Sequence, residues 1–428
     1  MINLILFGTF FIMLLLNIPI AVSLGTSAIL AMLYAHDPFT VISTNVYNGM
    51  AKFLLLAIPF FVLSGNIMAK AGISTRLVNF IDDCVGHRRG GIAIVCVIVA
   101  CFFGAISGSG PATVAALGII LIPAMINRGG FSAPFASAMM ATASSIAIVI
   151  PPSIAFVVYA SITGVSVGDM FMGGILPGIM MGLALVVIIM LEVRKQGLKA
   201  SRERASWGQR ARTFGTAFWG FLVPVIILGG IYGGIFTPTE AAAVSVVYGL
   251  FVGVFIYREV KWKDMGELLV DSGKTTGGIM LIIGSATLFA YICTIHGISQ
   301  AAQGLLLDIA GNKIVFLLIV NVIFLIAGCF VDANSAMYIF IPIMYPVAQQ
   351  LGIDLVHFGV LSTVNLAIGQ STPPLGVNLF VSCGIAKISI EENARAMVKF
   401  LIANIIALLL ITYIEPISLT IPKLMGLM

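Results

Sequence analysis

Apolar stretches long enough for membrane-spanning helices follow one another along almost the whole chain, separated by short polar or glycine-rich stretches. A helix of about 20 apolar residues crosses the hydrocarbon core of a bilayer. The strict polar–apolar alternation of a barrel strand is absent from these stretches. The pattern therefore predicts an all-α polytopic membrane protein. The uninterrupted spans are expected over residues 2–17, 20–35, 53–70, 171–191, 214–235, 240–256, 277–297 and 398–415.

Two more apolar stretches, residues 132–163 and 355–385, are interrupted by the double prolines Pro151-Pro152 and Pro373-Pro374. Proline lacks the backbone N–H and its ring clashes with the preceding helical turn, so each pair predicts a broken membrane helix. Lipid cannot solvate the backbone groups that a break leaves free. Each break must therefore be buried in protein or line a watered cavity.

A different pattern occurs over residues 91–127, where Arg88-Arg89 precede the stretch and Arg128 follows it. Basic residues at both ends place both ends in the cytoplasm, which predicts a re-entrant helical hairpin. Small and polar residues, "GAISGSGPAT" from Gly104 to Thr113, mark its tip. A second hairpin is expected over residues 314–350, entered from the other side and carrying "GCFVDANS" at its tip.

The two halves of the chain match at a nearly constant distance, which indicates an internal repeat. We assume that each half crosses the membrane an odd number of times, as repeats of inverted topology require. The matched residues are Gly104 with Gly328, Pro123 with Pro346, Pro151 with Pro373, and Lys52 with Lys274, at offsets of 224, 223, 222 and 222.

Composition and charge support this organisation and set its orientation. The chain is 60% hydrophobic and 9% charged, against about 25% charged residues in soluble domains. Residues 194–212 contain seven basic residues and one acid. A nucleic-acid patch is the weaker interpretation of this run, and a cytoplasmic loop between the halves is the stronger one. All Lys and Arg except Lys52, Lys313 and Lys423 then lie on the cytoplasmic side of an inner membrane, and both termini are periplasmic.

Other polar features are better explained by a structural role than by catalysis or metal binding. Thr237-Pro238-Thr239-Glu240 predicts a capping box at a helix start. The six cysteines and four histidines show no metal-ligand spacing. A Walker-type loop, an HExxH motif and a Ser–His or paired-Asp constellation are all absent from the sequence, which argues against a membrane enzyme.

The two hairpin tips and the two helix breaks should converge on one polar site in the membrane. Free carbonyls at the breaks suit Na⁺, and free N–H groups at half-helix starts near Pro111, Ser153 and Ser335 suit an anion. Lys and Arg are absent from all four segments, so a bound anion would be met by dipoles, hydroxyls and cations. The residues expected to bind substrate are Ser109, Gly110, Thr113, Ser153, Asn334, Ser335, Gln370 and Asn378.

Asp332 is the one acid between Lys313 and Asp354. An ionisable residue at membrane depth is a functional candidate. Three roles remain open from the sequence: coordination or support of a cation, a cap on the returning helix of the hairpin, and carriage of a proton.

These segments resemble the large membrane subunit of tripartite ATP-independent periplasmic (TRAP) transporters, through "FFGAISGSGPATVAA", "IPPSIAF", "GIFTPTEAAA" and "TPPLGVNLF". The resemblance covers essentially the whole chain. It implies an elevator transporter driven by Na⁺, with a small four-helix membrane subunit and a periplasmic binding protein that delivers an organic anion. The implied division is 1–90 (scaffold helices and arm of the first repeat), 91–170 (transport domain, first half), 171–192 (scaffold helix), 193–213 (basic loop), 214–312 (scaffold helices and arm of the second repeat), 313–395 (transport domain, second half) and 396–428 (last scaffold helix).

The resemblance also implies two Na⁺ sites, each where a hairpin tip meets a helix break. One involves Gly104, Ser107, Ser144, Ser145 and Ile150, and the other Gly328, Asp332, Gly369, Thr372 and Leu375. Ala147 replaces the glycine expected in the first break, which puts close backbone approach there in doubt. The small subunit is expected to be a separate chain, since this chain begins at the large subunit's first helix.

The alternative function is a stand-alone Na⁺- or H⁺-coupled anion symporter of the same inverted-repeat design. C4-dicarboxylates, sialic acid, other sugar or keto acids and sulfonates all offer an anionic group that this site could hold.

Overall fold

The computed structural model describes residues 1–198, 200 and 202–426, and within these ranges it is helical almost throughout. Eight of the described helices are long and apolar enough to cross a membrane. The pair α8 (Ala133–Val149) and α9 (Ile154–Thr163), bent by 42°, makes a ninth candidate span. These findings confirm the prediction of an all-α polytopic membrane protein.

The described helices divide between the two halves of the chain. The first half has α1 (Ile2–Leu15), α2 (Ile20–Ala35), α3 (Thr40–Met50), η1 (Phe53–Leu56), α4 (Ala57–Lys70), α5 (Ile73–Val85), α6 (Gly91–Ser107), α7 (Gly110–Asn127), α8, α9 and α10 (Val167–Gln196). The second has α11 (Trp207–Tyr232), α12 (Pro238–Phe251), η2 (Val252–Ile256), η3 (Trp262–Asp264), α13 (Met265–Ile295), α14 (Ile298–Ala310), α15 (Lys313–Phe330), α16 (Ala333–Gln350), α17 (Leu355–Gly369), α18 (Val377–Ala386), α19 (Ile390–Tyr413) and α20 (Pro416–Leu424).

The spacing of these helices follows the predicted repeat. Helices α5 and α14 begin at residues 73 and 298, 225 apart, and α8 and α17 begin at 133 and 355, 222 apart. The stretch before them differs between the halves. Lys52 lies in a break between α3 and η1, whereas its proposed counterpart Lys274 lies within the continuous helix α13.

Several elements extend beyond the predicted spans or were not predicted. Helix α13 begins at Met265 rather than at residue 277, because its first turns carry Glu267, Asp271 and Lys274 and are helical without being apolar. The short helices α3, α5, α14 and α20 were not predicted as elements of their own. A search for apolar stretches finds the part of a helix that faces lipid and overlooks its polar ends.

Local chemistry explains the helix boundaries at the functional segments. Ser153 begins α9 by accepting the Phe156 N–H through its hydroxyl, as expected for a serine N-cap. The capping box at Thr237 and Glu240 is confirmed at the start of α12. In both breaks the Pro–Pro peptide bond is cis.

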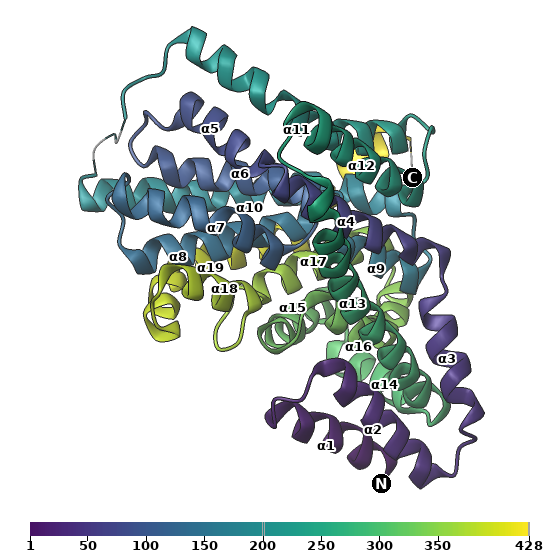
Figure 1. The fold of residues 1–428 in the computed structure, drawn as a ribbon. Coiled ribbons are helices and arrows are strands. Elements are labelled where there is room, and N and C mark those ends of the chain that lie inside the picture. The colour runs from purple at the N-terminus through teal and green to yellow at the C-terminus, as the bar shows by residue number, and fades with distance from the viewer. Residues whose placement is uncertain (199, 201, 427–428) are drawn as a thin grey trace.

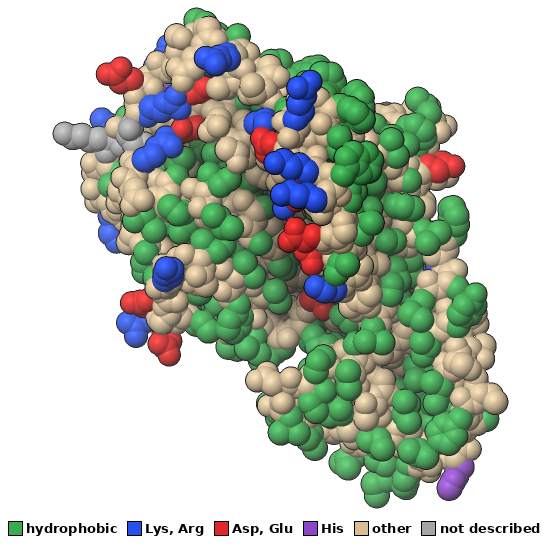
Figure 2. Space-filling model, in the orientation of Figure 1, with side chains coloured by type: hydrophobic (Ala, Val, Ile, Leu, Met, Phe, Trp, Pro, Cys, Tyr) green, Lys and Arg blue, Asp and Glu red, His purple; other side chains and the backbone are tan. Residues whose placement is uncertain are grey.

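The hairpins and broken helices form the middle of the molecule. Helices α1 and α2 pack together and against α13 at one end, while α11 packs on α5 and α12 on α4 at the other (Figure 1). On the face shown in Figure 2, apolar side chains cover the α1–α2 end, and Lys and Arg side chains gather near α5 and the start of α11. The helices that carry the segments of interest therefore lie between these two peripheral groups.

Candidate functional site

A cavity of about 410 Å³ lies where the four polar segments meet. Its wall includes Ser107–Ala112 of the first hairpin tip, Asp332–Asn334 of the second tip, and Gln370 of the second break. Ile148 and Ile154 line it from the two sides of the first break. The predicted convergence of hairpin tips and helix breaks is thus present in the structure.

The first hairpin tip is held by a set of hydroxyl contacts. The hydroxyls of Ser107 and Thr113 lie 3.0 Å apart, and the Thr113 hydroxyl donates to the Ser109 carbonyl over 2.8 Å. Gly108 has a φ of +58°, and a Cβ placed there would lie 2.9 Å from the Pro152 carbonyl oxygen. Glycine is therefore needed both for the turn and for the approach of this tip to the first break.

The hairpins touch the broken helices through glycine in both halves. A Cβ at Gly104 would lie 2.4 Å from the Cα of Ala147, and a Cβ at Gly369 would lie 2.6 Å from the Cα of Gly328. The close approach that Ala147 put in doubt is thus present, because Gly104 on the hairpin lacks a side chain. The two contacts have the same form, with one Gly–Ala pair and one Gly–Gly pair.

Asp332 is the N-cap of α16 and also lines the cavity. Its Oδ2 accepts the N–H groups of Asn334 and Ser335 at 3.0 and 3.3 Å, and its Oδ1 accepts the Ser335 hydroxyl. The half-helix therefore starts at Ala333 rather than near Ser335, since an aspartate cap satisfies the first free donors. The capping role is observed, and a carboxylate oxygen remains beside the cavity.

The predicted cation ligands lie on both sides of each hairpin contact. The Gly104 carbonyl accepts the Gly108 N–H and the Gly369 carbonyl accepts the Thr372 N–H, each over 2.8 Å. A carbonyl oxygen has two lone pairs, so each keeps one for another partner. Among the described residues, no group of three or more His, Cys, Asp or Glu side chains could hold a metal ion.

The two breaks are joined directly by a hydrogen bond between the hydroxyls of Ser145 and Ser371, 2.9 Å apart. Both serines are fully buried. Ser371 was not among the predicted site residues, although it lies in the polar stretch around the second double proline. Ser144, predicted beside Ser145, instead donates its hydroxyl to the Ala141 carbonyl within its own helix.

Several predicted residues lie behind the cavity wall. Of the predicted substrate residues, Ser109, Gly110, Asn334 and Gln370 line the cavity, whereas the others support the wall from behind. Thr113, Ser153 and Ser335 make the hydroxyl contacts and caps described above, and Asn378 is buried against Gly110. From the predicted cation set, Ser107 and Asp332 line the cavity. Leu375 is 45% exposed, and only its backbone carbonyl could serve a cation because its side chain has no oxygen atom.

Unpartnered polar atoms surround the cavity. Asn334 Oδ1, Gln370 Oε1 and both amide atoms of Asn378 are buried without a hydrogen-bond partner. A buried polar group without a partner costs free energy, so these atoms are suited to a bound ion or solute.

Two polar residues of the opposite wall were missed by sequence reasoning. Asn66 of α4 and Thr275 of α13 line the cavity, and the Asn66 side chain donates to the Ser272 hydroxyl over 2.8 Å. Asn66 could have been found as an isolated amide within an apolar span. Thr275 was placed outside the membrane because α13 was predicted to begin at residue 277.

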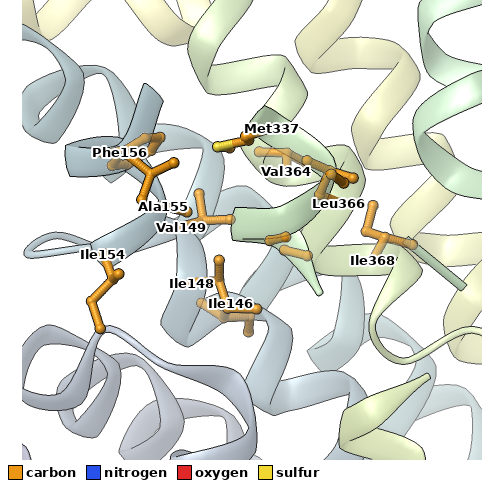
Figure 3. Packing of buried hydrophobic residues seen from close by; sticks show 14 of the residues in the cluster. Ile146, Ile148, Val149, Ile154, Ala155, Phe156, Met337, Val364, Leu366 and Ile368 are labelled. Atoms are coloured by element: carbon orange, nitrogen blue, oxygen red, sulfur yellow. The ribbon is translucent and has the colours of Figure 1, made fainter. Parts of the chain in front are cut away.

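Apolar packing holds the broken helices in place around these polar groups. Figure 3 shows Ile146 and Val149, before the first break, and Phe156, after it, on the same side of the core as Met337, Val364 and Leu366 of the second half. All six side chains are buried in one continuous core. This apolar packing positions the polar atoms, because closely packed protein interiors deform little.

Substituting Ser145 or Ser371 by alanine tests the contact between the breaks. Each single change should destabilise the protein by about 0.5–1.5 kcal/mol, the usual net worth of a hydrogen bond. The double variant should lose less than the sum of the singles, by about 0.5 kcal/mol or more. Melting temperatures of the purified variants in detergent measure this, and strictly additive losses would show that the two hydroxyls are not paired.

Comparison with known proteins identifies the family of this chain. The family described as "Tripartite ATP-independent periplasmic transporter, DctM component" matches residues 7–417. The C4-dicarboxylate TRAP transporter large permease protein DctM of Pseudomonas aeruginosa is 41% identical over 406 residues, covering 95% of each chain. The 2,3-diketo-L-gulonate TRAP transporter large permease protein YiaN of Escherichia coli is 34% identical, covering 87% of this chain and 88% of the relative.

A third relative is longer than this chain. The isethionate TRAP transporter permease protein DctMQ of Oleidesulfovibrio alaskensis is 39% identical, and the match covers 97% of this chain but 65% of the relative. All three relatives are named as transporter permeases, and none as an enzyme. The chain is therefore a multi-pass membrane protein that belongs to the TRAP transporter family, as its DctM component, the large permease.

Proposed function

We propose that this chain couples the uptake of a small organic anion to a Na⁺ gradient, by an elevator movement of the helices that carry the hairpins and breaks. The observation that supports this most is the single cavity shared by both hairpin tips and both halves of the chain. A volume of about 410 Å³ is in the range of small-molecule sites.

Oxygen atoms at the two contacts between hairpin and broken helix, beside the cavity, would hold Na⁺. Gly104, Ser107, Ser144, Ser145 and Ile150 would form one site, and Gly328, Asp332, Gly369, Thr372 and Leu375 the other, mostly through backbone carbonyls. The remaining lone pairs of the Gly104 and Gly369 carbonyls and the carboxylate of Asp332 supply the negative potential that a cation needs. Bound Na⁺ would contribute positive charge beside the anion.

The solute would be held without a basic side chain, since the residues that line the cavity include no Lys or Arg. Hydroxyls, the amides of Asn334 and Gln370, and the N–H groups at the start of α7 are the available donors. The three relatives are named for C4-dicarboxylate, isethionate and 2,3-diketo-L-gulonate, all of which are organic anions. A C4-dicarboxylate is the first solute to test, because the 41% identical relative is named for it.

In the proposed elevator movement, one part of the cavity wall would move and the other would stay in place. Gly65 of α4 faces the first tip, where a Cβ would lie 3.3 Å from the Ser107 Cα. Helices α4 and α13 would stay with the scaffold while the hairpins slide past them. Helices α10 and α19, expected in the scaffold from the sequence, pack against α8 and α17.

We expect three further features of the complex: a separate four-helix membrane subunit, a periplasmic binding protein, and an orientation with the loop 194–212 in the cytoplasm and both termini in the periplasm. Membership of the large-permease family supports the two partners, and the relative named DctMQ, of which the match covers 65%, is the longer permease to compare with this arrangement.

Uptake of labelled dicarboxylate into proteoliposomes tests the proposal. The vesicles would contain both membrane subunits, with the binding protein added outside. Uptake should fall to background when the Na⁺ gradient is dissipated or the binding protein is omitted. Uptake that ignores the gradient would refute Na⁺ coupling, and uptake without the binding protein would favour the stand-alone symporter.

A further inference from the structure

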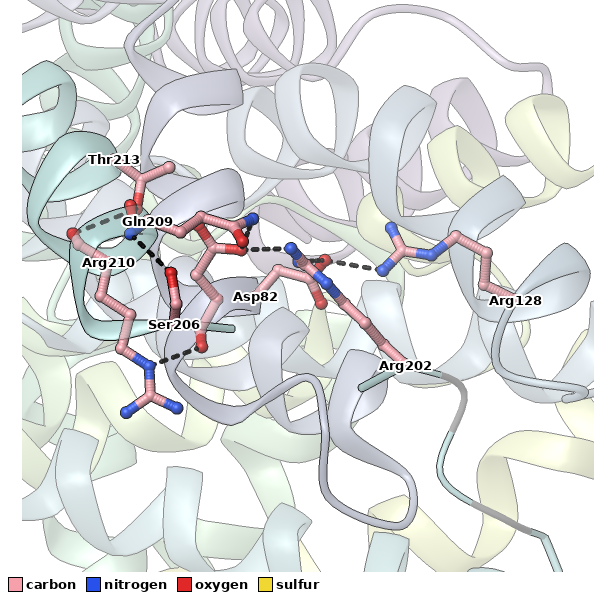
Figure 4. Close-up of polar contacts among 8 residues, drawn as sticks. Asp82, Arg128, Arg202, Ser206, Gln209, Arg210 and Thr213 are labelled. Carbon is pink, nitrogen blue, oxygen red and sulfur yellow. Dashed lines mark hydrogen bonds and ion pairs between the residues drawn. The ribbon is translucent and has the colours of Figure 1, made fainter. Parts of the chain in front are cut away.

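A second polar cluster lies away from the cavity, where the last turn of α5 meets the loop between α10 and α11. Asp82 and Asp83 are 5% and 3% exposed, so their charges need close partners. Asp82 pairs with Arg128 at 2.6 Å and with Arg202 at 2.9 Å, and Arg202 also reaches Asp83 (Figure 4). The two acids are thus neutralised by two arginines.

Arg210 belongs to the same cluster but is left without an acid. Its Nε donates to the Asp83 backbone carbonyl over 3.2 Å, which fixes the side chain. Its guanidinium points away from Asp82, Arg128 and Arg202 (Figure 4). Its Nη2 is buried and has no hydrogen-bond partner among the described residues. A fixed, partly desolvated guanidinium with free donors is a site for an anion.

Two more arginines are near. Arg89 forms an antiparallel bridge with Ala200, which places the loop that carries Arg88 beside the loop that carries Arg204. Burial, and then the charges of Arg210, Arg204 and Arg88, lower the pKa of His87. Among the described residues, Arg88, Arg204 and Arg210 form no ion pair. Three arginines without an ion-pair partner in the described part of the chain therefore lie near His87.

The position of Arg210 at the start of a membrane-spanning helix points to the class of anion. Trp207 is the first residue of the membrane-spanning helix α11, is 78% exposed, and lies with its ring 5.2 Å from the Arg210 guanidinium carbon. An exposed tryptophan at the end of a span lies at the level of the lipid headgroups. Basic pockets at this level bind anionic headgroups, and a guanidinium matches phosphate oxygens in pairs.

We propose that Arg210, supported by Arg88 and Arg204, binds the phosphate of an anionic phospholipid beside Trp207. The bound lipid would hold the linker between the two halves of the chain against the membrane. This site is separate from the cavity and does not depend on the transport chemistry proposed above.

Native mass spectrometry of the full-length protein, released from nanodiscs of phosphatidylcholine with or without phosphatidylglycerol, tests this site. The wild type should retain phosphatidylglycerol in preference to phosphatidylcholine. Arg210→Gln should weaken retention by about tenfold or more, as expected for the loss of charge-assisted hydrogen bonds. Arg395→Gln, which removes an exposed arginine of α19 outside the cluster, is the matched control and should retain lipid as the wild type does.

The remaining outcomes also decide the question. If Arg210→Gln does not fold, the double change Arg88→Gln and Arg204→Gln, at two exposed positions, should lower retention instead. Equal retention by the wild type and by whichever of these variants folds would overturn the proposal. Displacement of the lipid by millimolar inorganic phosphate would assign the site to free phosphate and likewise overturn it.

Discussion

Replacing Asp332 by asparagine is expected to raise the Na⁺ concentration for half-maximal uptake by about tenfold, which corresponds to about 1.4 kcal/mol. The Asp332 carboxylate caps α16 and also lines the cavity. Asparagine caps a helix nearly as well as aspartate, so the substitution keeps the cap and removes only the charge. Uptake into proteoliposomes at a series of Na⁺ concentrations measures the effect, and the melting temperature checks the fold.

Asp354 offers a matched control for this experiment. It caps α17 through the N–H groups of Val356 and His357 at 2.9 and 3.0 Å, much as Asp332 caps α16. It does not line the cavity. Asp354→Asn should therefore leave the Na⁺ dependence unchanged.

The three roles left open for Asp332 predict different results. If Asp332→Asn behaves as the wild type, Asp332 is only a cap. A loss of the pH dependence of uptake with unchanged Na⁺ dependence would instead identify a proton carrier. Weakened Na⁺ dependence alone supports coordination of the cation.

The helix breaks and the hairpins could be predicted from the sequence because their causes are local. Two consecutive prolines remove two backbone donors wherever they occur, and Ser153 supplies the cap that restarts the helix. Such segments must be enclosed by protein, because lipid cannot solvate their free backbone groups. Their convergence can therefore be predicted before any coordinates are known. The Na⁺ sites themselves rest on the family resemblance and stay a prediction.

The rest of the site could not be predicted because it depends on tertiary packing. Nothing in the sequence shows that Ser371 meets Ser145, since they lie 226 residues apart and join different halves. Asn66 and Thr275 reach the cavity only through the placement of α4 and α13 against the first hairpin. The predicted spans began too late in α13 and α19 for another reason. The first turns of these helices are charged, so they are helical but not hydrophobic.

Replacing Gly369 by alanine is expected to abolish uptake and to destabilise the protein by about 1–3 kcal/mol, the usual cost of overpacking. The added Cβ would lie 2.6 Å from the Cα of Gly328 and 2.8 Å from its carbonyl carbon. These are backbone atoms, which cannot rotate away as a side chain can. The second hairpin must move away from the break, and the Gly369 and Gly328 carbonyls move with it. Uptake assays and melting temperatures of the purified variant measure the two effects.

The comparison with Gly384 separates this contact from a general effect of glycine. Gly384 lies in α18, just beyond the second break, and nothing lies within 4 Å of a Cβ placed there. Gly384→Ala should therefore keep uptake and gain slightly in stability, because alanine favours a helix over glycine.

Gly104→Ala should behave as Gly369→Ala. Adding Ala147→Gly should not rescue it, since the nearest atom to the new Cβ is the Cα of residue 147 rather than its methyl group. Wild-type uptake in Gly104→Ala and Gly369→Ala would show that neither close contact is needed, and the proposed Na⁺ sites at these contacts would then be wrong.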